Sequence, residues 1–146
     1  MNTLIDTYGR VHRNLRVSLT DRCNLRCTYC MPNDFAAWLP SDHQLTTDEL
    51  VRVIDIAVKE GINEVRLTGG EPLLRPDIVE IVARINAIEN APTLTMTTNA
   101  LTLEKVAKPL ADAGLTRINI SLDTLDRDRF KLMTHRDRID DVFAGI

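Results

Sequence analysis

Three cysteines, Cys23, Cys27 and Cys30, lie within eight positions of a 146-residue chain. Three and then two residues separate them, so one short loop can turn the three sulfur atoms toward a common centre. Thiolates are soft ligands that suit iron–sulfur clusters. A four-iron cluster held by three cysteines leaves one iron without a protein ligand, and an open position of this kind is what catalytic metals use. The spacing therefore predicts a [4Fe–4S] site with one position free for chemistry.

Other interpretations of these cysteines stay open. A structural zinc site needs four ligands, and His12 or His43 could supply the fourth. Inert buried thiols, or one disulfide beside a free thiol, are further alternatives. An odd, tightly clustered set of cysteines argues against a secreted disulfide framework. Because the N-terminal stretch also lacks a secretory signal pattern, we expect a cytoplasmic protein.

A second candidate motif is Gly69-Gly70-Glu71-Pro72, which follows the strand-like stretch 64–68. Backbone at a Gly-Gly pair can approach a ligand closely because no Cβ atom intervenes. The carboxylate of Glu71 could bind an ammonium group nearby. A Gly-Gly pair by itself is more often a tight turn than a binding site.

Alternating strands and helices must position these two motifs. Alternating or apolar patterns predict strands at 15–19, 64–68, 93–97 and 117–121. Helical spacing predicts helices between the capping box at 46–49 and Gly61, and then at 77–87, 103–113, 126–133 and 139–146. Residues 1–13 are expected to be a tail, and residues 31–45, with two prolines, a loop.

This alternation predicts an α/β fold with right-handed βαβ units and a parallel sheet, formed by four βα units from residue 14 onward. Four strands could make half of a barrel or a small open sheet. Function gathers at the carboxyl ends of parallel strands, where both motifs lie. The chain ends inside a helical pattern without a cap, so we expect a truncated chain whose last βα unit is incomplete.

Composition excludes several functional classes. Hydrophobic residues make up 44% and charged residues 27% of the chain, which is a globular balance. The net charge is −3, so no general basic field attracts nucleic acid or an anionic membrane. No stretch approaches the roughly 20 apolar residues of a membrane span. We therefore expect neither nucleic acid nor membrane as a partner.

The cysteine motif, with an aromatic residue before its last cysteine, resembles the radical S-adenosylmethionine superfamily, and Gly69-Gly70-Glu71-Pro72 resembles the second motif of that superfamily. Further segments resemble one of its families, the GTP 3′,8-cyclases of molybdenum cofactor biosynthesis. These segments are Leu15-Arg16-Val17-Ser18-Leu19-Thr20-Asp21-Arg22, Met31-Pro32, Trp38-Leu39-Pro40, Arg66-Leu67-Thr68, Leu73-Leu74-Arg75, Thr97-Thr98-Asn99 and Asn119-Ile120-Ser121-Leu122-Asp123. The resemblance implies the first part of a partial (β/α)6 TIM-like barrel.

The resemblance also implies an activity, which is conversion of GTP to (8S)-3′,8-cyclo-7,8-dihydroguanosine 5′-triphosphate. A [4Fe–4S] cluster and S-adenosylmethionine would be the cofactors, and a 5′-deoxyadenosyl radical would remove the ribose 3′ hydrogen. An external reductant would supply the electrons, and a homodimer is one assembly open to such a chain. The positions matching S-adenosylmethionine contacts are Tyr29, Gly70, Glu71 and Ser121, and those matching GTP contacts are Arg16, Arg66 and Thr97.

The chain departs from the family pattern in two places. Ala100 stands where most members have glycine, and alanine resists a positive φ. No cysteine follows Cys30, so the second cluster and the C-terminal half that carry it in the family are missing. We therefore expect this chain to hold the first cluster without cyclising GTP alone. Another radical S-adenosylmethionine enzyme, such as a peptide-modifying one, and a non-enzymatic zinc-binding module are the alternatives.

Overall fold

A four-stranded parallel sheet forms the centre of the computed structural model, which describes residues 3–31 and 37–146. The strands lie in chain order as β3 (Asn14–Ser18), β4 (Glu64–Thr68), β5 (Thr93–Thr98) and β6 (Arg117–Ile120). The bounds agree with the four predicted strands to within one residue at each end. Pro32, which belongs to the Met31-Pro32 segment, lies outside the described residues.

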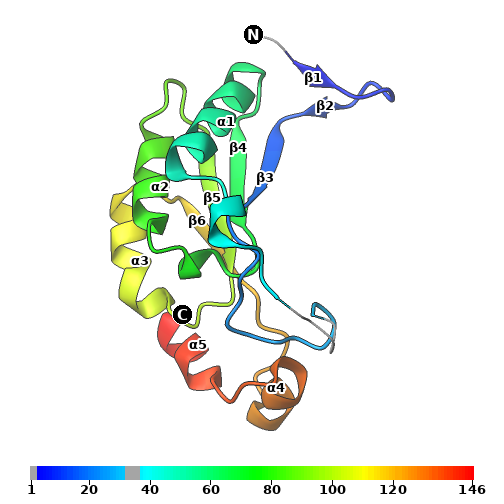
Figure 1. The fold of residues 1–146 in the computed structure, drawn as a ribbon, viewed down its shortest axis with the longest axis vertical. Helices are drawn as coiled ribbons and strands as arrows, with labels where there is room; N and C mark the ends of the chain where they lie inside the picture. The colour runs from blue at the N-terminus through cyan, green and yellow to red at the C-terminus, as the bar shows by residue number, and fades with distance from the viewer. Residues whose placement is uncertain (1–2, 32–36) are drawn as a thin grey trace.

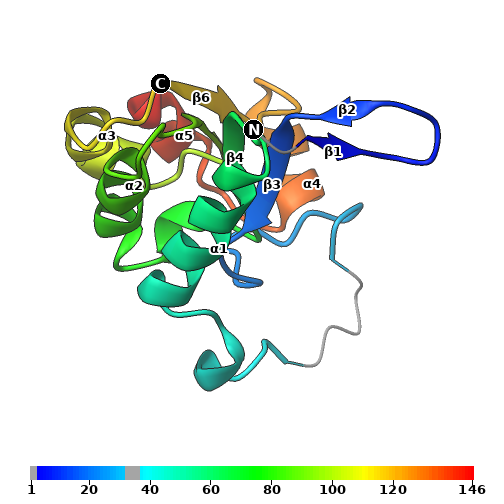
Figure 2. The ribbon, with the colours of Figure 1, turned by 90° about the horizontal axis from the view of Figure 1, so that it is seen from above.

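Three helices cover one face of this sheet, as Figures 1 and 2 show from two directions. They are α1 (Thr47–Lys59), α2 (Ile78–Asn86) and α3 (Leu103–Asp112), and each connects one strand to the next. Strand order without reversal, with helices on a single face, is the pattern of a barrel and differs from a doubly wound sheet. The α/β fold class and the barrel-like arrangement of βα units are therefore confirmed.

Two shorter helices, α4 (Arg127–Thr134) and α5 (Ile139–Gly145), lie near the carboxyl ends of the strands (Figure 1). Asp126 caps α4, because its carboxylate accepts a hydrogen bond from the Arg129 N–H at 2.8 Å. Helix α5 packs against α3 and α4. These contacts place α4 beside the segment that carries the cysteines.

Local sequence explains where the first covering helix begins. The Thr46 hydroxyl accepts from the Glu49 N–H at 3.3 Å, and the Glu49 carboxylate accepts from the Thr46 N–H at 2.8 Å. This is the predicted capping box, and it satisfies two backbone donors that a helix start leaves free. Gly61 follows the helix with a φ of 101°, as expected for a C-terminal cap.

The sheet has one apolar and one polar face. Val65, Leu67 and Met96 point toward the helices and are fully buried. Their strand neighbours, such as Arg16 and Arg66, point to the other face. A parallel sheet covered on both sides shows continuous apolar runs. Here the pattern alternates because, among the described residues, helices cover only one face.

The N-terminal segment contains structure that the sequence did not predict. Within the expected tail, β1 (Leu4–Ile5) and β2 (Val11–His12) form an antiparallel hairpin. The Asp6 carboxylate stabilises its turn by accepting from the backbone N–H groups of Tyr8 and Arg10 at 2.9 and 3.0 Å. Two short 3-10 helices occur elsewhere, η1 (Ser41–His43) in the expected loop and η2 (Pro72–Leu74). None of the described helices has the length and apolar character to cross a membrane.

Candidate functional site

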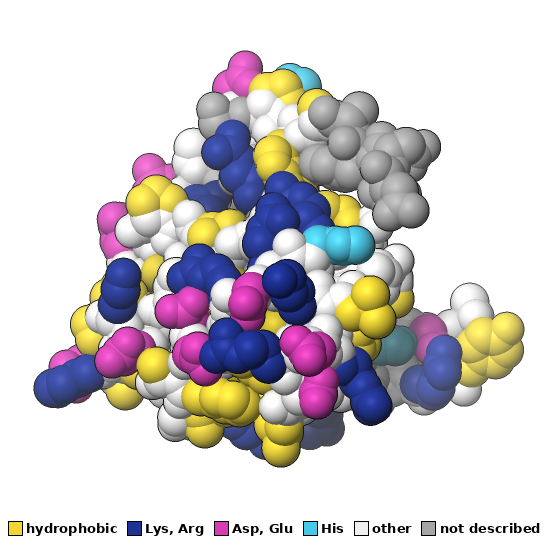
Figure 3. Space-filling view, turned by 90° about the horizontal axis from the view of Figure 1, so that it is seen from below, with side chains coloured by type: hydrophobic (Ala, Val, Ile, Leu, Met, Phe, Trp, Pro, Cys, Tyr) yellow, Lys and Arg dark blue, Asp and Glu magenta, His cyan; other side chains and the backbone are white. Residues whose placement is uncertain are grey.

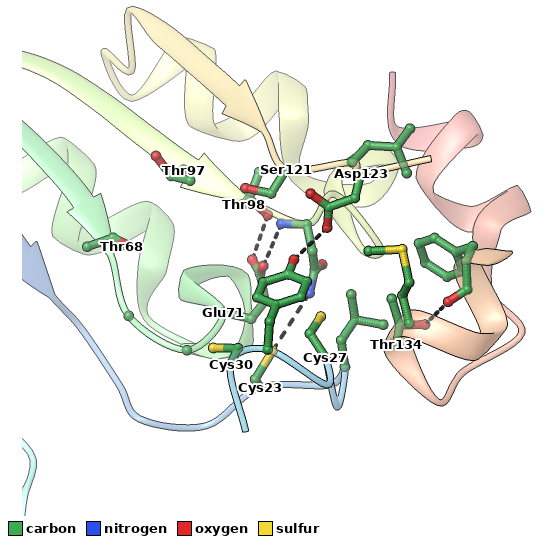
Figure 4. A pocket seen from close by; sticks show the side chains of 18 of the residues that line it. Cys23, Cys27, Cys30, Thr68, Glu71, Thr97, Thr98, Ser121, Asp123 and Thr134 are labelled. Carbon is green, nitrogen blue, oxygen red and sulfur yellow. Dashed lines mark hydrogen bonds between the residues drawn. The ribbon is translucent and has the colours of Figure 1, made fainter. Parts of the chain in front are cut away.

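A cavity of about 260 Å³ opens where the sheet strands end, and Figure 4 shows the side chains around it. Its walls come from the cysteine loop, the turn after β4, the ends of β5 and β6, and helix α4. Carboxyl ends of parallel strands are where α/β proteins place their ligands. The cavity is therefore the candidate active site.

All three cysteines line this cavity, and none forms a disulfide. Cys23 and Cys27 are partly buried, and burial raises the pKa of both thiols, whereas Cys30 is exposed. A raised pKa favours the protonated form of both thiols, so metal binding must displace these protons. Among the described residues, no three His, Cys, Asp or Glu side chains are already arranged to hold a metal ion.

The donor set nevertheless fits an iron–sulfur cluster. Three unpaired thiols from one loop border a single cavity, and cysteine thiolates are the usual ligands of such clusters. A cysteine side chain has more than one staggered position, so the direction of each sulfur is not set by its backbone alone. Convergence of the three sulfurs on one cluster stays a prediction.

The Gly-Gly turn holds the cysteine loop in place. The Gly70 N–H donates to the Thr20 carbonyl and the Glu71 N–H to the Arg22 carbonyl, both at 2.7 Å. These bonds extend the pairing of β3 and β4 beyond the strands. A Cβ on Gly69 would lie 2.5 Å from the Thr20 oxygen, and one on Gly70 would overlap the Arg22 oxygen. The glycines are required here because two backbones pass in close contact.

Helix α4 supports the same loop from the other side. The Arg26 N–H donates to the Thr134 carbonyl and the Thr28 N–H to the Met133 carbonyl, each at 2.9 Å. The Arg26 guanidinium also donates to the Cys23 carbonyl at 2.7 Å. The loop is thus tied to α4, about 105 residues further along the chain.

Glu71 has an environment that its motif did not predict. Its side chain is only 1% exposed, and burial raises the pKa of this carboxyl above its ordinary value. One oxygen accepts from the Thr98 hydroxyl at 2.6 Å and from the Leu73 N–H at 3.0 Å. The other oxygen accepts from the Asn99 N–H at 2.8 Å. Glu71 lines the cavity and joins the ends of β4 and β5, while its contact with a bound cosubstrate stays a prediction.

Tyr29 connects the cysteine loop to the end of β6. Its hydroxyl donates to the Asp123 carboxylate at 2.5 Å, and this hydrogen bond raises the pKa of the tyrosine (Figure 4). The Tyr29 side chain is 66% exposed, so its ring is accessible at the mouth of the cavity. Ser121, also predicted to contact S-adenosylmethionine, lines the same side.

The predicted GTP residues divide into two groups. Thr97 lines the cavity, but Arg16 and Arg66 do not. These two arginines lie side by side in register on the polar face of the sheet. The Arg66 Nε donates to the Thr95 hydroxyl at 3.3 Å. Because Thr97 is two residues beyond Thr95 on the same strand, its side chain shares the polar face and links the arginines to the cavity.

The surface around α4 and α5 carries charges of both signs (Figure 3). Arg127 pairs with Asp137 at 2.8 Å and also with Asp140, and Arg138 pairs with Asp141 at 2.6 Å. These exposed pairs contribute little stability. Positive and negative side chains are therefore interspersed on this face.

Neither histidine proposed as a zinc ligand lines the cavity. His12 lies in the hairpin, where its Nε2 is 3.3 Å from the Asp6 carboxylate, and His43 ends η1.

The cavity also includes residues that the sequence did not predict to lie there. Asn99 belongs to the Thr97-Thr98-Asn99 segment but was not predicted to contact a ligand, and no sequence pattern pointed to Phe130, Met133 or Thr134 of α4.

The fold and the site together define a radical S-adenosylmethionine protein. The family model described as the Radical SAM superfamily matches residues 17–146, and the chain belongs to this superfamily. Its members use a [4Fe–4S] cluster and S-adenosylmethionine.

Comparison with individual relatives points to one family within the superfamily. A GTP 3′,8-cyclase of Streptomyces coelicolor is 59% identical over 99% of this chain, and one of Listeria monocytogenes is 53% identical over 100%. The chain spans only 43% and 44% of the length of these two relatives. It is thus similar to their N-terminal part, in agreement with the expected truncation.

Solved structures support the fold alone. SuiB of Streptococcus suis, bound to the precursor peptide SuiA, matches with a TM-score of 0.69 at 24% identity, covering 88% of this chain and 28% of that one. The enzyme anSMEcpe with bound AdoMet matches with a TM-score of 0.66 at 20% identity, covering 90% and 38%. Both likenesses agree with a barrel-like arrangement.

Proposed function

We propose that this chain is the N-terminal part of a GTP 3′,8-cyclase, which converts GTP to its 3′,8-cyclised dihydro product in molybdenum cofactor biosynthesis. The observation that carries the proposal is the joining of two surfaces. Three free thiols border the cavity, and Thr97 links this cavity to the sheet face on which Arg16 and Arg66 are neighbours. The identity of 59% with one cyclase supports this substrate over other radical chemistry.

Cys23, Cys27 and Cys30 would hold the cluster, and its open iron would face the cavity. When bound, the cluster and S-adenosylmethionine supply the radical chemistry, and the protein supplies orientation. The Tyr29 ring at the mouth, the Gly70 backbone and the Ser121 hydroxyl would position the cosubstrate. Glu71 would face the same ligand only through the part of its carboxylate that borders the cavity.

GTP would lie across the polar face of the sheet. Arg16 is exposed and Arg66 is partly exposed, so both guanidinium groups are accessible to an anion. Arginine forks suit phosphate oxygens because they donate two parallel hydrogen bonds. Thr97 would bring the nucleoside end toward the cavity, because it belongs to both surfaces.

Partners and location follow from the same proposal. An external reductant must supply two electrons per turnover, one for the cleavage of S-adenosylmethionine and one, with a proton, to complete the dihydro product, and a homodimer is the assembly we propose for the full-length enzyme. We place the protein in the cytoplasm, because free thiols and iron–sulfur clusters persist in reducing compartments.

Anaerobic reconstitution with iron and sulfide tests this proposal. We expect a brown protein with about four iron atoms per chain, whose electron paramagnetic resonance spectrum changes when S-adenosylmethionine is added. Cys23→Ser, Cys27→Ser and Cys30→Ser should each lose most of the iron. Thr28→Ser, a matched change in the same loop, should retain it, because Thr28 bonds to α4 through its backbone N–H, which serine keeps.

Two results would count against the proposal. A colourless protein that takes up one zinc per chain favours the zinc-binding module. A cluster whose spectrum does not respond to S-adenosylmethionine contradicts a radical enzyme, even if the iron content is as expected.

A further inference from the structure

Asn99 is a polar cavity residue that has no part in the proposed function. It follows β5 directly and is 8% exposed. Its side-chain nitrogen, Nδ2, donates to the Asn24 oxygen at 2.8 Å and makes a long contact of 4.0 Å with the Cys23 sulfur. Figure 4 draws the contact with the sulfur as a dashed line. A buried amide that reaches a proposed cluster ligand is the strongest unassigned feature of the site.

The orientation of this amide follows from its other partners. Its oxygen, Oδ1, accepts from the Leu101 N–H at 3.1 Å, and a backbone N–H can only donate. Turning the amide over would place an N–H₂ group against that donor. The NH₂ side must therefore face Asn24 and Cys23. It carries two hydrogens, so one can serve Asn24 while the other points toward the sulfur.

Glu71 fixes the backbone from which this amide projects. Its buried carboxylate accepts the Asn99 N–H at 2.8 Å and the Thr98 hydroxyl at 2.6 Å. Asn24, the other partner of the amide, is next to Cys23 in the chain. The amide is therefore held on the cavity side by partners from the turn after β4, the segment after β5 and the cysteine loop. Such a network restricts its position more than a single bond would.

We propose that Asn99 is a positioning residue that raises the reduction potential of the cluster by donating its second amide N–H to the Cys23 sulfur. This inference rests on the proposed function, because it requires Cys23 to ligate the cluster. Hydrogen bonds to cluster sulfurs are one of the factors that set the potential. A donor stabilises the more negative, reduced cluster more than the oxidised one, and the bond becomes stronger when the thiol becomes a thiolate.

A redox titration of the reconstituted chain, followed by electron paramagnetic resonance, tests the inference. Asn99→Ser removes Nδ2 but keeps a side-chain oxygen that can accept the Leu101 N–H. We expect the midpoint potential of this variant to become more negative by about 59 mV. For a one-electron couple, this shift corresponds to a tenfold change in the ratio of oxidised to reduced cluster at a given potential. Asn119→Ser makes the same change on an exposed residue of β6 that does not line the cavity, and should leave the potential unchanged.

The outcomes separate the inference from the proposed function. If neither the unsubstituted chain nor any of its variants binds a cluster, the proposed function fails. If the cluster forms and Asn99→Ser titrates like Asn119→Ser, the inference is overturned. If Asn99→Ser binds no cluster, the near-isosteric Asn99→Asp is tested. Loss of the cluster in both variants, with retention in Asn119→Ser, also overturns the inference, because Asn99 then acts on loop structure and not on potential.

Discussion

Glu71 is the residue whose surroundings explain the most about this site. Its carboxylate is almost fully buried, yet both of its oxygens have donors from neighbouring segments. Leaving such buried donors without an acceptor costs more than the net gain of forming one bond. The glutamate therefore acts as a structural link between strand ends, in addition to lining the cavity.

Replacing this carboxylate by an amide tests the structural link. In Glu71→Gln one oxygen becomes an N–H₂ group, which then faces the Asn99 N–H or its neighbours. We expect the free energy of unfolding to fall by about 1–3 kcal/mol, measured by urea denaturation of the cluster-free protein at neutral pH. Glu104→Gln, an exposed residue in the first turn of α3, should change it by less than about 0.5 kcal/mol. Equal stability of the two variants would contradict this role.

Ala100 carries strain at the same end of β5. Its φ is 63°, and the left-handed region costs a non-glycine residue about 1–2 kcal/mol. The sequence suggested that alanine would resist such a conformation. The structure adopts it nonetheless, because the Ala100 N–H donates to the Thr98 hydroxyl at 3.0 Å and its carbonyl accepts from Leu103 at 3.0 Å.

At the scale of elements, the turn after β4 determines where the cysteine loop lies. Backbone hydrogen bonds from Gly70 and Glu71 reach the Thr20 and Arg22 carbonyls, and α4 supports the loop from the other side. The loop itself has no regular structure, so its position depends on these neighbours.

Adding one methyl group at Gly70 should therefore displace the loop. The Cβ of Gly70→Ala would lie 2.5 Å from the Asp21 oxygen and even closer to that of Arg22. We expect loss of at least half of the reconstituted iron and a destabilisation of about 1–3 kcal/mol. Iron analysis and thermal unfolding measure the two effects.

Gly9→Ala is the matched control for this change. Gly9 has a positive φ but no atom within 4 Å of its would-be Cβ, so strain stays in the hairpin turn. This variant should bind iron normally. Unchanged iron content in Gly70→Ala would refute the positioning role of the turn.

The whole molecule presents an open sheet. Within the described residues β3 and β6 each pair on one side only, and no helix covers the polar face. Unpaired strand edges favour association with other strands. The chain also spans 43% of the length of its Streptomyces coelicolor relative. The proposed GTP surface therefore lacks a second wall within the described residues.

We expect these 146 residues alone to bind the cluster without forming cyclised product. The reason is that catalysis requires the nucleotide to be held within a fraction of an ångström of its reacting position, and an open face cannot do this. Mass spectrometry after incubation with GTP, S-adenosylmethionine and dithionite measures the product. The full-length Streptomyces coelicolor cyclase is the positive control, and the Cys23→Ser variant of this chain sets the background. Product at the rate of the full-length enzyme would contradict the expectation.

The sequence by itself determined the four strands of the sheet, the five α-helices and the cysteine motif. The capping box at Thr46, the cap at Asp126 and the strand patterns were readable because helix caps and side-chain periodicity depend on residues a few positions apart. The hairpin at Leu4–Ile5 was missed because two-residue strands are too short to show a period.

Only the tertiary structure decided how distant residues meet. The Tyr29–Asp123 bond joins residues 94 positions apart, and Asn99 reaches Cys23 across 76 positions. The tertiary structure also placed Arg16 and Arg66 on the polar face of the sheet and not in the walls of the cavity. Such contacts depend on the register of parallel strands and on the packing of α4 against the loop. No local pattern of residue types encodes these long-range contacts, because the contacts form only when the whole sheet has formed.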